Sequence, residues 1–382
     1  MADGCDTLII QRVVPHYRVP LFSCLHERFG IKVVTAATPP GGTFLNLADP
    51  RELDFAIAAP FVFPDPTNPF AARVPTAWII EALRPRRVIA EFGMRLSSTY
   101  QLAFARRTGR LGRLGFWSHG WQMGRGRGSR VDRAIQFARP PLMAAADVNA
   151  TYTDEGAEWI RRHLPRTPVV ALGNALDLAA INLAASTSTA IRHGSPQFLA
   201  VGRLTADKCY DRLLDVFAQV RTTYPDAALT VIGDGPERER LMAQAGAQPG
   251  GSIRILGTLY GEADLAPHFM GADFCLIPGA AGLTVNHALA YCVPVVAFAR
   301  SGSGPLHHPE IEYVVDGKTG VLVPGHTAQD MSEVVIAAYA SGLHRRLRSK
   351  MALSGHLPSL ESVADKCSTL LKLMPIDGIC SK

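Results

Sequence analysis

Short runs of apolar and β-branched residues recur along the chain and are separated by longer stretches of helical character. A strand, a helix and another strand in repetition predict parallel sheets covered by helices on both faces. The runs predict strands at Thr7–Val14, Lys32–Ala36, Phe55–Ala58, Val88–Glu91, Leu114–Ser118, Val148–Tyr152, Val169–Leu172, Phe198–Val201, Ala228–Ile232, Ile253–Leu256, Phe274–Ile277, Val295–Phe298 and Val321–Val323.

The strand pattern restarts after residues 181–196, a polar stretch of small residues. A length of 382 residues, 47% of them hydrophobic, also favours two domains. We predict an α/β protein with an N-terminal Rossmann-like domain over 1–180, a linker over 181–196, a C-terminal Rossmann-like domain over 197–345 and a helical tail over 346–382. Ligands of open parallel sheets lie beyond the carboxyl ends of the strands, which predicts a cleft between the two sheets.

The net charge of +6 is unevenly distributed, because residues 1–176 carry 22 Lys and Arg against 14 Asp and Glu, a balance of +8. The arginines of this half cluster at 84–87, 106–113 and 125–139. They form either an ordinary solvated surface or a surface that attracts anionic lipid headgroups or a phosphate-bearing acceptor. We expect no nucleic-acid partner, because aromatic residues do not alternate with the basic ones and no known binding motif occurs.

The cysteines indicate a reducing compartment. The chain has seven, scattered and without a Cys-x-x-Cys pair, which favours free thiols over disulfides or a zinc site. The N-terminus shows no secretory signal, and the apolar run Val293–Ala299 is far shorter than the roughly 20 residues of a bilayer span. We expect a cytoplasmic protein, with the inner face of the cell membrane as a peripheral location.

Several familiar motifs fail. Gly-Lys-Thr at 317–319 is no phosphate-binding loop, because the glycine required five residues before the Gly-Lys pair is Glu312. The glycine-rich segment 123–130 follows no strand directly and predicts only a basic loop. No Asp-x-Asp pair occurs that could hold a metal-bridged diphosphate. Residues 307–312, HHPEIE, hold two histidines and two glutamates, but no further ligand cluster lies nearby, so we expect no metal site.

Two segments of the second half predict an anion site. A strand ends at Gly202 and Arg203, and Lys208 precedes the next helix, so two cations flank the carboxyl end of the strand and can bind a diphosphate. In the segment PGAAGLTVNHALAYCVPVV, 278–296, a strand passes through Gly282 into a helix from about Leu283, with Thr284 in its first turn and His287 one turn later. Small residues and a helix start suit close approach of a diphosphate.

The ordered set VGRL…K, IGDGPE, ILG, GL…HALAYCVPVV and VVDGKTGVLVP, densest over 197–325, resembles the retaining glycosyltransferases of family four, also called group one. That resemblance implies the GT-B fold of two Rossmann-like domains facing a cleft, and assigns donor diphosphate binding to Arg203 and Lys208. The family carries two glutamates with seven residues between them, the second of which binds ribose. Here those positions are Gly279 and His287, so we predict that Glu310 or Glu312 restores the missing carboxylate beside a neutral His287.

The remaining site predictions concern the base and the first half. Backbone groups near Gly257, Thr258 and Leu259 are expected to recognise the base. The resemblance suggests that His119, directly after a strand, reaches the transferred sugar, although a histidine tied to backbone is the alternative. His16, Tyr17 and Arg18 follow the first strand. They are the remaining candidates for contacts to the acceptor or to the donor phosphate.

The resemblance implies a hexosyltransferase that moves a sugar from a UDP or GDP sugar to a hydroxyl acceptor with retention, without metal or cofactor. A lipid-linked sugar in bacterial surface polysaccharide or glycolipid assembly is the expected acceptor. Two alternatives stay open: a GT-B nucleotide-sugar epimerase or hydrolase, and a catalytically inactive sugar-nucleotide-binding partner.

Overall fold

The computed structural model describes residues 6–36, 47–64, 73–121, 130–246, 251–301, 304–352 and 357–376. The chain divides into two compact units. Unit 1 comprises residues 1–177 and 358–382, and unit 2 comprises residues 178–357. Of the predicted basic loop 123–130, all residues except Arg130 lie outside the described ones.

Within its described residues, unit 1 contains a seven-stranded parallel sheet in the order β3-β2-β1-β4-β5-β6-β7. Apolar residues fill both faces of its central strands, as expected for a parallel sheet covered by helices. The strands are β1 Thr7–Ile10, β2 Lys32–Ala36, β3 Ala56–Ala59, β4 Arg87–Glu91, β5 Arg113–Ser118, β6 Val148–Thr151 and β7 Val169–Ala171.

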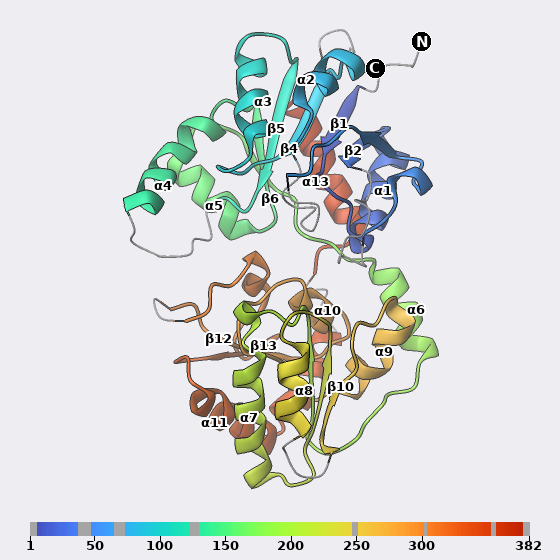
Figure 1. Ribbon diagram of the computed structural model, residues 1–382, viewed down its shortest axis with the longest axis vertical. Helices are drawn as coiled ribbons and strands as arrows, with labels where there is room; N and C mark the ends of the chain where they lie inside the picture. The colour runs from blue at the N-terminus through green and yellow to red at the C-terminus, as the bar shows by residue number, and fades with distance from the viewer. Residues whose placement is uncertain are drawn as a thin grey trace. The chain divides into compact units, whose positions relative to one another are not determined.

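The last helix of the chain belongs to unit 1 (Figure 1). α13 packs against α1 and β7 and buries an apolar stripe that includes Val363, Cys367 and Leu370. The predicted tail 346–382 is therefore not one segment, because its earlier part, in α12, lies in unit 2. The helices of unit 1 are α1 Val19–Phe29, α2 Thr76–Trp78, α3 Ser97–Arg107, α4 Arg130–Met143, α5 Asp154–His163 and α13 Leu360–Lys372.

Unit 2 contains, within its described residues, a six-stranded parallel sheet in the order β10-β9-β8-β11-β12-β13. The order runs outward from β8 in one direction and from β11 in the other, which is the strand order of a Rossmann sheet. The strands are β8 Gln197–Val201, β9 Ala228–Ile232, β10 Ile253–Ile255, β11 Phe274–Ile277, β12 Val295–Phe298 and β13 Gly320–Val323.

The predicted linker is partly helical, because α6 begins before it at Leu178, continues to Thr187 and packs against α9. Two short 3-10 helices, η5 Ala206–Lys208 and η7 Pro309–Tyr313, interrupt the loops after β8 and β12. The helices are α6 Leu178–Thr187, α7 Tyr210–Thr223, α8 Arg238–Gly246, α9 Glu262–Gly271, α10 Thr284–Ala290, α11 Ala328–Ala340 and α12 Leu343–Ala352.

Candidate functional site

The strand order of unit 2 reverses between β8 and β11, and a small pocket lies at the carboxyl ends of these two strands. Open α/β sheets bind ligands at such reversal points, because the loops that follow the two strands diverge there. The pocket is lined by Val201, Lys208, Tyr210, Leu276, Ile277, Pro278, Ala280, Gly282 and Thr284.

Lys208 connects the loop after β8 to the loop after β11. Its Nζ donates a hydrogen bond to the carbonyl oxygen of Ala280 at 2.7 Å, and the N–H of Ala280 donates to the carbonyl of Asp207 at 2.9 Å. The Lys208 side chain keeps 22% of its surface exposed, so its other two N–H groups can serve a ligand. Burial lowers the pKa of Lys208, and the positive charge of Arg203 lowers it further, whereas Asp207 and Glu310 oppose this.

A buried histidine organises the turn between β11 and α10. The N–H of Ala281 donates to His307 Nδ1 at 3.0 Å, and the N–H of His308 donates to the carbonyl of Ala281 at 3.0 Å. Since Nδ1 accepts, the ring proton of neutral His307 is on Nε2. Burial lowers the pKa of His307 to about 4, and the charge of Lys208 acts in the same direction. His307 is therefore neutral at physiological pH and holds the turn by accepting a hydrogen bond from its backbone.

Two glycines in this turn have different surroundings. A Cβ at Gly279 would lie 2.4 Å from the carbonyl oxygen of Asp207 and 2.4 Å from the backbone carbon of Lys208. A Cβ at Gly282 would lie 3.8 Å from Lys208 Nζ, which is an ordinary contact distance. Position 279 therefore has no room for any side chain. At position 282 there is room for a Cβ, and the backbone faces the ammonium group of Lys208.

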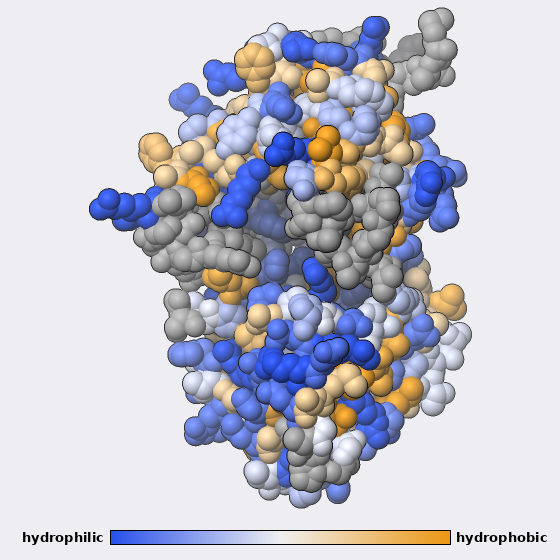
Figure 2. Space-filling model, viewed as in Figure 1, coloured by the Kyte–Doolittle hydropathy of each residue, from blue (hydrophilic) through white to orange (hydrophobic). Residues whose placement is uncertain are grey.

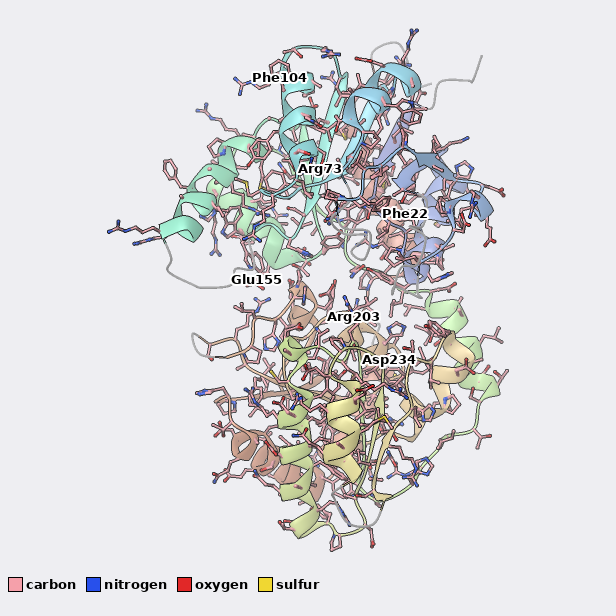
Figure 3. The ribbon with its side chains drawn as sticks, viewed as in Figure 1. Phe22, Arg73, Phe104, Glu155, Arg203 and Asp234 are labelled. Atoms are coloured by element: carbon pink, nitrogen blue, oxygen red, sulfur yellow. The ribbon has the colours of Figure 1, made fainter. Side chains whose placement is uncertain are left out.

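Arg203 and Thr284 lie on either side of the end of β8. Thr284 Oγ1 donates to the carbonyl of Val201 at 2.8 Å, which fixes the first turn of α10 on β8, and Gly202 lies beside Thr284. Arg203 is exposed and lies with Asp234 at the same end of the unit 2 sheet (Figure 3). The structure thus brings the predicted donor-binding residues Gly202, Arg203, Lys208, Gly282, Leu283 and Thr284 to one end of the sheet.

The two predicted catalytic glutamates lie on η7. Glu310 is buried, with 6% of its surface exposed, and its charge raises the pKa of Lys208 against the effect of burial. Glu312 is half-buried on the same short helix. The carboxylate hydrogen-bonded to His287 comes from neither of these residues.

That carboxylate belongs to Glu262, the first residue of α9. His287 Nε2 lies 3.2 Å from Glu262 Oε1, and the hydroxyl of Tyr291 donates to Glu262 Oε2 at 2.7 Å. The rings of His287 and Tyr291 stack on Phe269 at centroid distances of 6.3 and 5.0 Å. Glu262 carries no distinguishing signal in the sequence, because an acid in the first turn of a helix is common and interacts favourably with the helix dipole.

The loop between β10 and α9 carries the predicted base contact. Gly257 adopts φ 77° and Gly261 adopts φ 86°, a region that favours glycine. The carbonyl of Gly257 accepts from the N–H of Gly233 at 2.8 Å. This hydrogen bond anchors the loop to the end of β9, and Leu259 lies within the loop, between the two glycines.

In unit 1 the strand order reverses between β1 and β4, and an ion pair occupies this point. Arg12 Nη2 and Nε donate to Glu91 Oε1 and Oε2 at 2.7 and 3.0 Å. Arg18 is only 8% exposed and lies over the rings of Trp117 and Tyr152 at 5.4 and 5.1 Å. The buried Arg18 therefore packs against aromatic side chains of the unit 1 core, whether or not it also contacts a ligand.

The other predicted residues of unit 1 come from two distant parts of the chain. The ring of His119 lies tilted against the ring of Tyr152, with ring centroids 4.9 Å apart. His16 is exposed and Tyr17 half-buried on the short helix η1 His16–Arg18. Because Tyr152 contacts both His119 and Arg18, one aromatic ring brings these two predicted residues together.

Several arginines of the basic half are engaged inside unit 1. Arg106 forms two hydrogen bonds of 2.7 Å with Asp147, and Arg113 lies 3.5 Å from the same carboxylate. Arg139 is buried and donates to the carbonyl of Gly120 at 2.8 Å. Arg106 and Arg113 therefore share the negative charge of Asp147, and Arg139 is withdrawn from the surface of unit 1.

In the described part of the chain no three His, Cys, Asp or Glu side chains gather as metal ligands, the segment 307–312 included. The helices found there include none with the length and apolar character needed to cross a bilayer.

One family model matches within unit 2, and two relatives match about a third of the chain. The family model of group 1 glycosyl transferases matches residues 195–341. The GDP-mannose-dependent alpha-(1-6)-phosphatidylinositol monomannoside mannosyltransferase of Mycolicibacterium smegmatis is 35% identical over 141 residues, which are 34% of this chain and 35% of the relative. Sulfoquinovosyl transferase SQD2 of Arabidopsis thaliana is 33% identical over 130 residues, 33% of this chain and 23% of its own. The matches therefore span about a third or less of these relatives.

Solved structures resemble the whole chain. Anabaena HepE in complex with UDP and glucose has a TM-score of 0.65 at 14% identity, over 96% of this chain and 99% of its own. The lipopolysaccharide outer core galactosyltransferase WaaB has a TM-score of 0.63 at 14% identity over the same shares. With its two parallel-sheet units, the protein has the GT-B fold, which confirms the fold prediction.

Proposed function

We propose that the protein is a glycosyltransferase that binds a nucleoside diphosphate sugar in unit 2 and transfers the sugar to a hydroxyl acceptor. The observation that supports this most strongly is the pocket at the β8/β11 reversal point, where Lys208 and the side-chain-free Gly282 meet. A diphosphate carries charge that an ammonium and a guanidinium can bind at short range. The group 1 match covers this same region.

The proposed chemistry is mainly electrostatic. Lys208 and Arg203 stabilise the diphosphate as the bond to the sugar breaks, and the acceptor hydroxyl attacks from the face that the diphosphate leaves, so that configuration is retained. Glu310, Glu312 and His119 are the proposed groups for contact with the transferred sugar and the proton of the acceptor. The reaction needs no cofactor or metal in this proposal, and the donor is a hexose carried by UDP or GDP.

The proposed acceptor is a sugar or lipid-linked sugar at a membrane surface, as in bacterial surface polysaccharide or glycolipid assembly. The names of the two sequence relatives, a phosphatidylinositol mannoside mannosyltransferase and a sulfoquinovosyl transferase, support it. Phe104 and Phe137 are 63% and 85% exposed on α3 and α4, which also carry the exposed Arg107 and Arg133. Exposed aromatic residues beside cations suit an anionic lipid interface. Figure 2 shows hydrophobic residues scattered among hydrophilic ones on this view of unit 1.

A donor panel tests the proposal. UDP and GDP sugars are incubated with the protein, with and without bacterial lipid extract, and nucleotide release and new glycolipid are measured. Nucleotide release that needs the extract supports transfer, and the anomeric configuration of the product tests retention. Conversion without acceptor would favour an epimerase or hydrolase, and binding without conversion an inactive partner.

Variants test the diphosphate contacts. Arg203→Ala is expected to lower turnover by about a hundredfold or more, the cost of removing one preorganised contact to developing charge. Arg345→Ala, which removes an exposed arginine of α12, is the matched control. Near-normal turnover of Arg203→Ala would remove this residue from the proposed diphosphate site.

A further inference from the structure

Glu262, His287 and Tyr291 form a hydrogen-bonded cluster that the proposed chemistry leaves without a role. His287 lies on α10 and Tyr291 directly follows that helix, and each bonds to a different oxygen of the Glu262 carboxylate, at 3.2 and 2.7 Å. Phe269 stacks on both rings and fixes their planes. The carboxylate is thus positioned by two elements of unit 2, α9 and α10.

The protonation state of the cluster follows from its geometry. Burial alone would raise the pKa of Glu262, but the hydrogen bonds from His287 and Tyr291 outweigh it and lower that pKa. The pKa of the Tyr291 hydroxyl is raised, by burial and then by Glu262, so the hydroxyl keeps its proton. Because an ionised carboxylate only accepts, His287 Nε2 must carry a proton and donate it. Glu262 is therefore an anion held by two donors.

The anion has acceptor capacity left. A carboxylate offers about four lone-pair sites, and His287 and Tyr291 use two of them. The Glu262 side chain remains 25% exposed, so solvent-borne donors can reach it. A pair of neighbouring hydroxyl groups is a ligand that matches an anion with two unused acceptor sites.

The place of the cluster in unit 2 identifies which hydroxyl groups these are. Glu262 directly follows the loop Gly257–Gly261, the predicted contact to the base. His287 lies one helical turn after Thr284, which lines the proposed diphosphate pocket. In a nucleotide, the ribose joins the base to the diphosphate. Through the Glu262–His287 contact, the cluster links the helix that follows the predicted base loop to the helix that begins at the pocket.

We propose that Glu262 accepts hydrogen bonds from the ribose hydroxyls of the bound nucleotide, with His287 and Tyr291 as positioning residues that orient the carboxylate. This inference rests on the proposed function, because it requires a nucleotide in the unit 2 pocket. It also explains the imidazole of His287, which donates to the carboxylate in place of contacting the ribose.

Binding of ribose and deoxyribose nucleotides tests the role of Glu262. Dissociation constants are measured by calorimetry for UDP and GDP and for their 2′-deoxy and 3′-deoxy forms. The wild-type protein is expected to bind a ribonucleotide about tenfold more tightly than a deoxy form, as the loss of one hydrogen bond to a charged group predicts. Glu262→Gln is expected to lose most of this preference. Asp264→Asn, which removes an exposed acid from the same helical turn, is the control and should keep it.

Each outcome decides between the two proposals. If the wild-type protein binds neither UDP nor GDP, the proposed function and this inference both fall. If it binds them, but Glu262→Gln keeps the wild-type ratio of ribose to deoxyribose affinity, only the ribose contact falls. The same holds if Glu262→Gln weakens binding of UDP sugars but leaves UDP unaffected, because the carboxylate would then contact the transferred sugar.

A second variant covers the case in which Glu262→Gln does not fold. Tyr291→Phe removes one of the two donors that hold the carboxylate and keeps the ring stacked on Phe269. It is expected to lose part of the preference for ribose while the melting temperature stays near that of the wild type. An unchanged preference in folded Tyr291→Phe, together with a Glu262→Gln that cannot fold, would show a purely structural cluster and overturn the inference.

Discussion

Gly279→Ala is expected to damage the unit 2 site by steric overlap alone. The new Cβ would lie 2.4 Å from the carbonyl oxygen of Asp207 and 2.4 and 2.5 Å from the backbone carbonyl carbon and oxygen of Lys208. Ordinary contacts to a Cβ begin at 3.4 Å, so the two loops must separate by about 1 Å. All three opposing atoms are backbone, so no side-chain rotation can relieve the overlap.

The energetic cost follows from what holds the loops together. Overpacking of this kind costs about 1–3 kcal/mol, and each strained hydrogen bond adds about 1 kcal/mol. The bonds at risk are those from Lys208 Nζ and the Ala280 N–H, and that from Arg212 Nη1 to the Pro278 carbonyl at 3.2 Å. Overpacking of about 2 kcal/mol and the strain of one of these bonds, about 1 kcal/mol, total about 3 kcal/mol, which would lower the melting temperature by roughly 6–12 °C for a unit of this size.

Differential scanning calorimetry and nucleotide titration measure the two consequences. Gly279→Ala should melt earlier than the wild type and bind UDP or GDP more weakly, because Lys208 moves with its loop. Gly246→Ala is the control: it lies at the end of α8 with no atom within 4 Å of the added Cβ, and the melting temperature should stay level or rise. A melting temperature for Gly279→Ala within about 1 °C of the wild type would refute the steric argument.

Three further predictions concern the same loops. The unfolded-state histidine titrates near pKa 6.5, while His307 in the fold has a pKa of about 4. The stability from the neutral ring is therefore fully present above about pH 6.5, and roughly 3 kcal/mol is lost as the pH falls toward 4. His307→Asn, whose Oδ1 can still accept from Ala281, should flatten this loss in melting curves, and an unchanged slope would count against it. Because burial lowers the pKa of Lys208, the lysine should lose its proton, and nucleotide affinity should decrease, at a lower pH than for an ordinary lysine as the pH is raised. In Lys208→Arg this decrease should shift to higher pH in binding titrations, and identical pH profiles of the two proteins would contradict the prediction. Gly282→Ala has steric room and should fold normally yet weaken nucleotide binding; unaltered affinity would place the ligand elsewhere.

The strands were predictable because their signal is local. Every strand expected from an apolar run occurs in the structure, with small shifts at the ends. The largest shift is in β1, which ends at Ile10 although the apolar pattern continues to Val14. There the N–H of Gln11 still bonds to β2, but Val14 bonds to Ala48 in a loop. Distant parts of the chain decide with which segment a strand end pairs. A local run of apolar residues therefore cannot predict where the strand ends.

The parts that sequence patterns missed depend on long-range contacts. The tail 346–382 was expected to be helical, but the place of α13 in the core of unit 1 depends on α1 and β7. Glu262 has the appearance of a solvent-exposed acid until α10 brings His287 and Tyr291 against it. A histidine where the resembled family has a glutamate was the one signal in the sequence, and it pointed to a missing carboxylate without locating a replacement.

The two positions at which the resembled family carries glutamates, 279 and 287, have different surroundings in this structure. Position 279 cannot hold any side chain, because the backbone of η5 occupies the space beside it. Position 287 does hold a side chain, and that side chain donates to a carboxylate supplied by α9. Beside position 279, Lys208 Nζ bonds with the carbonyl of Ala280. Beside position 287, the negative charge is that of Glu262 in α9, whose Oε1 lies 3.2 Å from His287 Nε2. In the proposed function, the remaining polar contacts to the donor sugar come from η7, where the charge of Glu310 opposes the lowering of the Lys208 pKa by burial.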